Sequence, residues 1–163
     1  MKKIIYISFV ALIAMTSFAQ KKVTVKAGTI IPLLSVQETK AADVSEGQMI
    51  DFRVACDVIV DNVTVISQGA IAKGKVIEAR KSTVGGTKGK LIISINSLLL
   101  PNGNPLYFSN SDVRMYGHNR TPVAVVVGLF TGFGFLIPGS KAVLPANYEV
   151  QATVAANTDI VVE

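Results

Sequence analysis

The sequence has little of what catalytic and metal sites are commonly built from. Its 163 residues contain one histidine, His118, one cysteine, Cys56, and no tryptophan. A lone cysteine excludes an intrachain disulfide, and a histidine-based triad or metal site would have to converge on the polar turn around His118. An aromatic content of 7% argues against a stacking platform for sugars or bases. We therefore expect a fold held together by apolar burial, with no cofactor and no metal.

The acidic residues are scattered, and no two stand at a spacing that by itself indicates a carboxylate pair or a calcium loop. The glycine-rich segment Ala79–Lys90, "ARKSTVGGTKGK", does not have the Walker spacing and leads into a predicted strand rather than a helix. A phosphate cradle is therefore excluded there, and we predict that the protein is not an enzyme.

The first 19 residues have the pattern of a secretory signal peptide. Basic Met1–Lys3 precedes the apolar run Ile4–Met15, and Ser17–Ala19 forms a small-x-small cleavage pattern. The mature chain would be a single domain, Gln20–Glu163, with 14 basic and 11 acidic side chains and a net charge of +3. This mild excess does not indicate nucleic acid as a partner. The predicted location is the periplasm or the outer-membrane face of a Gram-negative cell.

Short alternating apolar runs separated by Gly, Asn, Pro and Asp predict an all-β fold, a small β-barrel or a flattened double barrel or sandwich. Asp61-Asn62 between apolar runs predicts a hairpin, and "PNGNP" around Gly103 predicts the turn that pairs 91–100 with 106–109. Met49–Val60 has a regular period of two, which predicts one long strand with Cys56 on its buried face. The remaining predicted strands are 23–25, 29–36, 63–67, 70–79, 148–154 and 160–162.

One pattern occurs three times: an apolar residue, two turn residues, a residue that accepts positive φ, and then a strand. The positive-φ positions are Gly28, Gly69 and Asn147, preceded by the apolar residues Val25, Ile66 and Leu144. We interpret this as one structural device used repeatedly in an internally repetitive barrel.

Two segments are candidates for interaction. The first is the loop Ala79–Lys90, in which Arg80, Lys81, Lys88 and Lys90 form either a solvated hairpin tip or a basic patch for anionic lipid or glycan. The second is Pro122–Gly139, which has no charge from Val123 to Ile137 and is too short for a straight helical span of the bilayer. It could form a buried strand with a glycine turn, an exposed hairpin that docks on another copy or partner, or a membrane-dipping tip. The apolar side chains that would make such a contact are Leu129, Phe130, Phe133, Phe135, Leu136 and Ile137.

Five motifs in series resemble the C-terminal domain of the VirB10/TrbI family of type IV secretion and conjugation scaffolds. They are Ala27–Pro32, Ala42–Gly47, Val65–Gly74, Leu100–Gly103 and Leu144–Asn147. The resemblance implies a non-enzymatic β-barrel of two flattened halves that assembles into rings. It also implies an apolar membrane-directed insertion at the place of Pro122–Gly139. The family's usual inner-membrane helix and proline-rich linker have no counterpart in this sequence, so the chain resembles an isolated barrel module.

These observations together predict an exported structural or assembly module that associates with itself or with an envelope protein, with possible contact to the outer membrane. The alternative is a small periplasmic barrel that binds a glycan or a lipid headgroup at a pocket bordered by Ala79–Lys90.

Overall fold

The computed structural model describes residues 21–84, 87–109, 111–117 and 139–162, and the predicted signal peptide lies outside these ranges. The all-β prediction is confirmed. No helix occurs in the described ranges, so none there is long and apolar enough to cross a membrane. The strands are β1 (Lys21–Val25), β2 (Ile30–Ser35), β3 (Thr39–Lys40), β4 (Met49–Val54), β5 (Val58–Val60), β6 (Val63–Ile66), β7 (Ile71–Arg80), β8 (Lys90–Leu99), β9 (Pro105–Ser109), β10 (Asp112–Tyr116), β11 (Val143–Leu144), β12 (Glu149–Val154) and β13 (Thr158–Val162).

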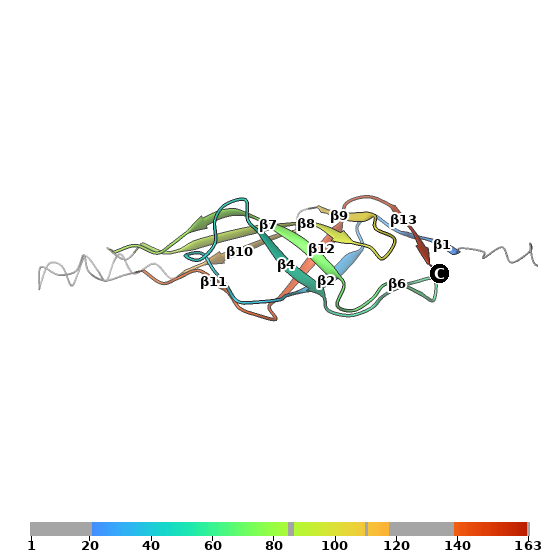
Figure 1. Cartoon of the computed structure of the whole chain (residues 1–163), viewed down its shortest axis with the longest axis horizontal. Helices are drawn as coiled ribbons and strands as arrows, with labels where there is room; N and C mark the ends of the chain where they lie inside the picture. Colours follow the sequence, from blue (N-terminus) through green and yellow to red (C-terminus); the bar gives the residue numbers. More distant parts are fainter. Residues whose placement is uncertain (1–20, 85–86, 110, 118–138, 163) are drawn as a thin grey trace, which may run out of the picture.

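Six strands close into an antiparallel barrel in the order β8, β7, β4, β2, β12 and β9, and β9 pairs back to β8. Strand β10 continues along β8 beyond the end of β9, and three two-stranded sheets, β1–β13, β3–β11 and β5–β6, complete the described chain. The molecule is elongated, with β1 and β13 at one end and β10 and β11 toward the other (Figure 1).

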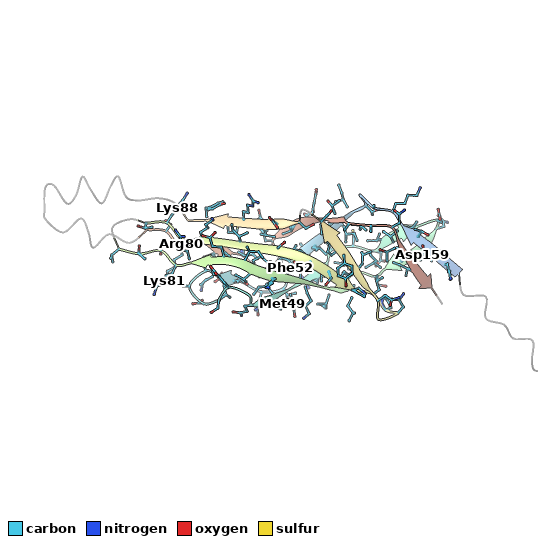
Figure 2. All side chains as sticks on the ribbon, turned by 90° about the horizontal axis from the view of Figure 1, so that it is seen from above. Met49, Phe52, Arg80, Lys81, Lys88 and Asp159 are labelled. Carbon is cyan, nitrogen blue, oxygen red and sulfur yellow. The ribbon has the colours of Figure 1, made fainter. Side chains whose placement is uncertain are left out.

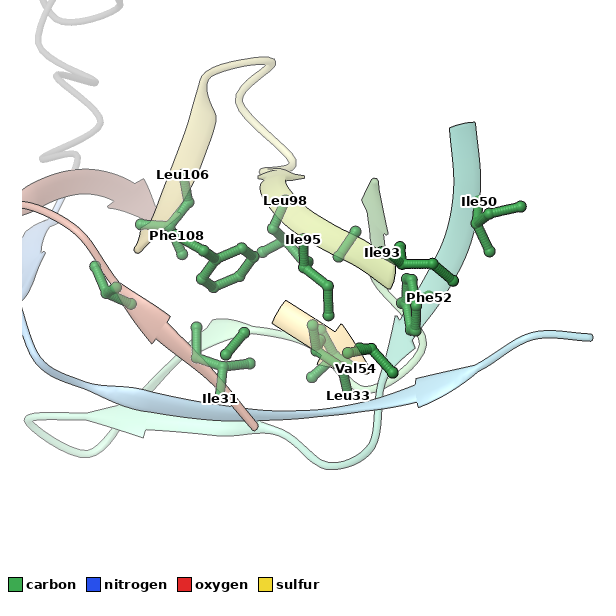
Figure 3. Packing of buried hydrophobic residues seen from close by; sticks show 14 of the residues in the cluster. Ile31, Leu33, Ile50, Phe52, Val54, Ile93, Ile95, Leu98, Leu106 and Phe108 are labelled. Atoms are coloured by element: carbon green, nitrogen blue, oxygen red, sulfur yellow. The ribbon is translucent and has the colours of Figure 1, made fainter. Parts of the chain in front are cut away.

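Apolar side chains fill the interior of the barrel because they alternate along its strands. In β8, Leu91, Ile93 and Ile95 are buried, whereas the residues between them are half-buried. Phe52 on β4 is the largest fully buried side chain of this core. Figure 3 shows it beside Ile93 in a cluster to which side chains from β2, β4, β8 and β9 contribute.

The repeated sequence pattern has a repeated backbone geometry. The φ angles of Gly28, Gly69 and Asn147 are 85°, 85° and 59°. The apolar residue three positions earlier is fully buried in each copy: Val25, Ile66 and Leu144. Each copy therefore anchors one buried side chain and then turns the chain into the next barrel strand.

The same pair of hydrogen bonds ties each turn to the strand beside it. Gly28 N–H donates to the Val154 carbonyl, and Val154 N–H donates to the Thr29 carbonyl, both at 2.9 Å. Two residues of one strand thus face one residue of its neighbour, which is a β-bulge with a positive-φ residue at its first position. The same pattern joins residues 69–70 to Val54 and residues 147–148 to Ser35.

The structure contains a fourth copy that the sequence pattern did not identify. Gly47 has a φ of 86° and donates its N–H to the Val76 carbonyl at 2.8 Å, while Val76 N–H donates to the Gln48 carbonyl at 2.8 Å. The four copies lead into β4, β7, β2 and β12, which are neighbours in the barrel. Each of the pairs β2–β12 and β4–β7 therefore carries two bulges, which bend the strands as closure of a barrel requires.

Barrel closure between β9 and β12 is short and is reinforced by a buried hydroxyl. Only Thr153 and Val154 of β12 pair with residues of β9. The hydroxyl of Ser111, which is 3% exposed, accepts a hydrogen bond from Thr153 N–H and donates one to the Ser109 carbonyl, both at 3.0 Å. This side chain thus holds the chain segment after β9 against β12.

Two local predictions are confirmed. Asp61 and Asn62, with φ of 50° and 62°, form the turn between β5 and β6. Strands β8 and β9 pair across the loop that contains Gly103, whose φ is 80° and whose N–H donates to the Leu100 carbonyl at 2.9 Å.

The prediction of one long strand over Met49–Val60 is wrong, and so is the prediction that Cys56 is buried. Strand β4 ends at Val54. Ala55 N–H still donates to the Pro32 carbonyl of β2 at 2.9 Å, in register with the Leu33–Val54 pair, but Pro32 has no N–H with which to extend the ladder. The chain therefore leaves the ladder, and the period of two that would turn Cys56 inward ends two residues before it. The thiol is exposed.

Candidate functional site

The four predicted basic residues lie around the tip of the β7–β8 hairpin. Arg80 is the last residue of β7, Lys90 is the first residue of β8, and Lys81 and Lys88 are in the connecting loop. Figure 2 shows Arg80, Lys81 and Lys88 together at one end of the molecule, far from Asp159 at the other. We call this region, defined by Arg80, Lys81, Lys88 and Lys90, the basic end.

Glu78 is the acid that pairs with two of these cations. Its carboxylate lies 2.6 Å from Lys90 Nζ and 3.5 Å from an Arg80 guanidinium nitrogen. Its side chain is 25% exposed, so these surface ion pairs contribute about 0–1 kcal/mol each. Their effect is to hold Arg80 and Lys90 along the strands and to offset part of their charge.

Lys81 and Lys88 are exposed and form no ion pair with any described residue. Lys88 Nζ instead lies 5.2 Å from the centroid of the Tyr116 ring on β10. At an exposed site such a cation–π contact is worth about 0.5–1 kcal/mol, and it leaves the charge of the ammonium group intact.

The two flanks of the apolar segment meet at the basic end. Gly117, at the end of β10, donates its N–H to the Gly89 carbonyl at 3.0 Å, and Gly89 N–H donates to the Ser140 carbonyl at 3.0 Å. Gly139 N–H donates to the Thr83 carbonyl at 3.2 Å. The chain therefore leaves the described barrel and re-enters it at the hairpin that carries the basic residues. The predicted contact residues Leu129, Phe130, Phe133, Phe135, Leu136 and Ile137, like His118, lie outside the described residues.

Two glycines make this junction possible. A Cβ atom on Gly117 would lie 1.9 Å from the Ser140 carbonyl oxygen, and one on Gly89 would lie 2.7 Å from the Ala142 nitrogen. Both obstacles are backbone atoms, which a rotamer change cannot move. Neither glycine was among the predicted site residues, although glycine beside or within a strand is a known sign of close backbone approach.

Further cations stand close to this junction. Lys141 is exposed and directly precedes Ala142, the residue that packs on Gly89. The neighbouring Ala142 carbonyl accepts the N–H of Ala41 at 3.0 Å, which brings Lys40 near. A hydrogen bond to Glu38 and the charge of that carboxylate raise the pKa of Lys40 above its usual value.

Several carboxylates elsewhere in the described chain have structural partners. Asp51 pairs with Lys73 at 2.6 Å, and Asp112 pairs with Arg114 at 3.2 Å. The Asp57 carboxylate accepts the Gln68 N–H at 2.6 Å in the bend that exposes Cys56. In residues 21–84, 87–109, 111–117 and 139–162, no three His, Cys, Asp or Glu side chains are grouped so as to hold a metal ion.

Comparison with known proteins found no matching protein-family model and no similar curated protein. Among solved structures, the chain is similar to ComB10 of the Com type IV secretion system of Helicobacter pylori. The two are 11% identical, the alignment covers 82% of this chain and 88% of that one, and the TM-score is 0.43. This likeness is distant, and the barrel is defined by the strand pairing described above.

Proposed function

We propose that this chain is a non-enzymatic assembly module of the Gram-negative cell envelope. It is exported to the periplasm or the outer-membrane face, and it associates with further copies of itself or with an envelope protein through the apolar segment Pro122–Gly139. The signal-peptide pattern of residues 1–19 supports export. The composition, poor in catalytic residue types, supports a structural role.

The observation that carries the proposal is the anchoring of both flanks of the apolar segment on one hairpin. Gly117 and Gly139 are hydrogen-bonded to Gly89 and Thr83, so the intervening residues start and finish at one end of the barrel. Fifteen of them, Val123–Ile137, have no charged side chain. An apolar segment of this size that reaches the surface of a soluble protein usually marks an interaction site.

The alternative, a barrel that binds a glycan or a lipid headgroup inside a pocket, has less support. Such a barrel needs a hollow interior. The interior here contains buried side chains from all six barrel strands, with Phe52, Ile93 and Ile95 at its centre (Figure 3). We therefore favour recognition by the end of the barrel over recognition inside it.

The proposal is tested by sedimentation velocity of residues 20–163 over a range of concentrations. We expect oligomers, and we expect the double variant Phe133→Asp/Phe135→Asp to be a folded monomer. The matched control is Leu99→Asp/Tyr107→Asp, which places two charges at side chains that are 61% and 62% exposed on β8 and β9. This control should associate as the wild type does.

Two outcomes would contradict the proposal. The first is a wild-type chain that stays monomeric at all concentrations and whose thermal midpoint rises with a glycan or a lipid headgroup, which would favour the binding alternative. The second is equal loss of association in the control and in the Phe133/Phe135 variant. A thermal melt of each variant distinguishes lost association from lost folding.

A further inference from the structure

We propose that the basic end is a docking surface for an anionic lipid bilayer. This inference does not require self-association, and it stands on the charge, exposure and hydrogen bonding of the β7–β8 hairpin and the residues packed against it.

The net charge of the predicted mature chain is concentrated in this hairpin. Residues 78–90 contain four basic side chains and one acidic side chain, a net charge of +3. Subtracting them from the 14 basic and 11 acidic residues of 20–163 leaves ten of each, so the rest of the chain is neutral overall. Exposed Lys141 adds a further positive charge beside the hairpin. A neutral body with one positive end orients that end toward a negative surface.

Hydrogen bonds fix the backbone that carries these cations. Thr83 N–H donates to the Thr87 carbonyl at 3.3 Å across the tip, and Gly89 is bonded on both sides, to Gly117 and to Ser140. Glu78 holds Arg80 and Lys90 on the strands, while Lys81 and Lys88 extend from the loop. Long lysine side chains on such an ordered hairpin can reach headgroup phosphates, while their aliphatic parts cover apolar surface.

Apolar and aromatic side chains among these cations favour a bilayer over a soluble polyanion. Val84, near the hairpin tip, is 64% exposed, and Tyr116 beneath Lys88 is 52% exposed. Tyrosine is enriched at the headgroup level of membranes, and apolar side chains beside basic ones are typical of segments that lie in the interface. A polyanion site would make no use of an exposed valine at its tip.

The test is co-sedimentation of residues 20–163 with vesicles of phosphatidylcholine alone or with about one-third phosphatidylglycerol. We expect binding to the anionic vesicles that weakens as salt is raised. Each basic residue near an anionic surface strengthens partitioning about fivefold, so Lys81→Gln/Lys88→Gln should lower the partition coefficient about 25-fold. Both side chains are exposed and unpaired with described acids, so the variant should stay folded, with a thermal midpoint lowered by no more than about 4 °C through loss of the contact between Lys88 and Tyr116.

The matched control is Lys22→Gln/Lys26→Gln, which removes the same charge from exposed positions in and just after β1. This strand lies at the opposite end of the molecule (Figure 1). The control should lower partitioning less than about twofold, because those lysines are more than a Debye length from the docked surface. Equal losses in the two variants would overturn the inference, since they would show a response to net charge alone.

Other outcomes separate this inference from the proposed function. Vesicle binding that depends on Phe133 and Phe135 but not on Lys81 and Lys88 would overturn the inference and leave the assembly role standing. A monomer that binds anionic vesicles through the two lysines would support the inference and contradict the assembly role. Tight binding to heparin without binding to anionic vesicles would show a polyanion site and would also overturn it.

Discussion

Replacing Gly117 with alanine is expected to open the junction at the base of the apolar segment without unfolding the barrel. The added Cβ would lie 1.9 Å from the Ser140 oxygen, 2.7 Å from the Ser140 carbonyl carbon and 3.2 Å from the Gly89 nitrogen. Carbon and oxygen atoms cannot approach within 3 Å in this way, and all three obstacles are backbone atoms. The end of β10 must therefore move away from the chain at Ser140.

The expected cost follows from the hydrogen bonds that this movement breaks. Two bonds are at stake, Gly117 N–H to the Gly89 carbonyl and Gly89 N–H to the Ser140 carbonyl, each 3.0 Å long. At about 1 kcal/mol each, their loss costs about 2 kcal/mol. Overpacking relieved by backbone shifts typically costs about 1–3 kcal/mol, which agrees with this figure, whereas an unrelieved contact of 1.9 Å would cost far more. The effect should stay local because the core side chains of the barrel are not touched.

Native-state hydrogen exchange measures this effect residue by residue. A loss of about 2 kcal/mol corresponds to about 30-fold faster exchange at the amides of Gly89 and Gly117. The amide of Val76, bonded to the Gln48 carbonyl on the barrel, should exchange as in the wild type. The control is Gly103→Ala, where no atom lies within 4 Å of the added Cβ and which should leave Gly89 and Gly117 unchanged. Unchanged protection at Gly89 and Gly117 in the Gly117→Ala variant would refute the close packing inferred here.

Three further predictions concern the barrel. Phe52→Ala should lower the free energy of unfolding by about 3–5 kcal/mol in urea titration, because the ring is fully buried, and a loss below about 1 kcal/mol would contradict its place in the core. Gly28→Ala should cost about 1–2 kcal/mol through its φ of 85° alone, since nothing lies within 4 Å of the added Cβ, and Gly28→Asn should cost less in the same titration. Ser111→Ala should cost about 1–3 kcal/mol and speed exchange of the Thr153 amide, which loses its acceptor; an unchanged Thr153 amide would rule out the closure role of the hydroxyl.

Local chemistry was sufficient to predict most of the barrel. Positive φ is cheap only for Gly and Asn, so Gly28, Gly69 and Asn147 identified three of the four bulged turns directly from the sequence. Strict alternation predicted five of the six barrel strands to within one residue at each end, and β4 is the exception. The fourth turn, Val44–Gly47, fits the same pattern and lies within the motif Ala42–Gly47, but it was not recognised as a further copy. Its apolar residue, Val44, is only partly buried, unlike those of the other three copies.

The errors occur where a distant residue decides the local structure. Met49–Val60 keeps its alternation throughout, but β4 ends at Val54, beyond which the neighbouring strand β2 offers Pro32, a residue with no N–H to donate to the ladder. Strands β3 and β11 are two residues long and exist only because they pair with each other across about a hundred residues of sequence. No local pattern carries that information.

In the candidate site, too, the local features were predictable from the sequence and the long-range contacts were not. Charge and hydropathy identified the loop Ala79–Lys90 and the segment Pro122–Gly139 as separate features of the sequence. The placement of the described flanks of this segment against the hairpin depends on backbone hydrogen bonds between Gly89 and both Gly117 and Ser140, which are 28 and 51 positions away. The glycines that allow this approach look like ordinary loop glycines in the sequence, because their role is set by the distant segment 140–142 that packs against them.

The most direct test of the account is light scattering on residues 20–163, measured with and without detergent. We expect particles of more than one copy in the absence of detergent, and smaller particles in the Phe133→Asp/Phe135→Asp variant. A stable monomer in both conditions would contradict the account, since the apolar segment would then be part of the core rather than the element through which the barrel associates.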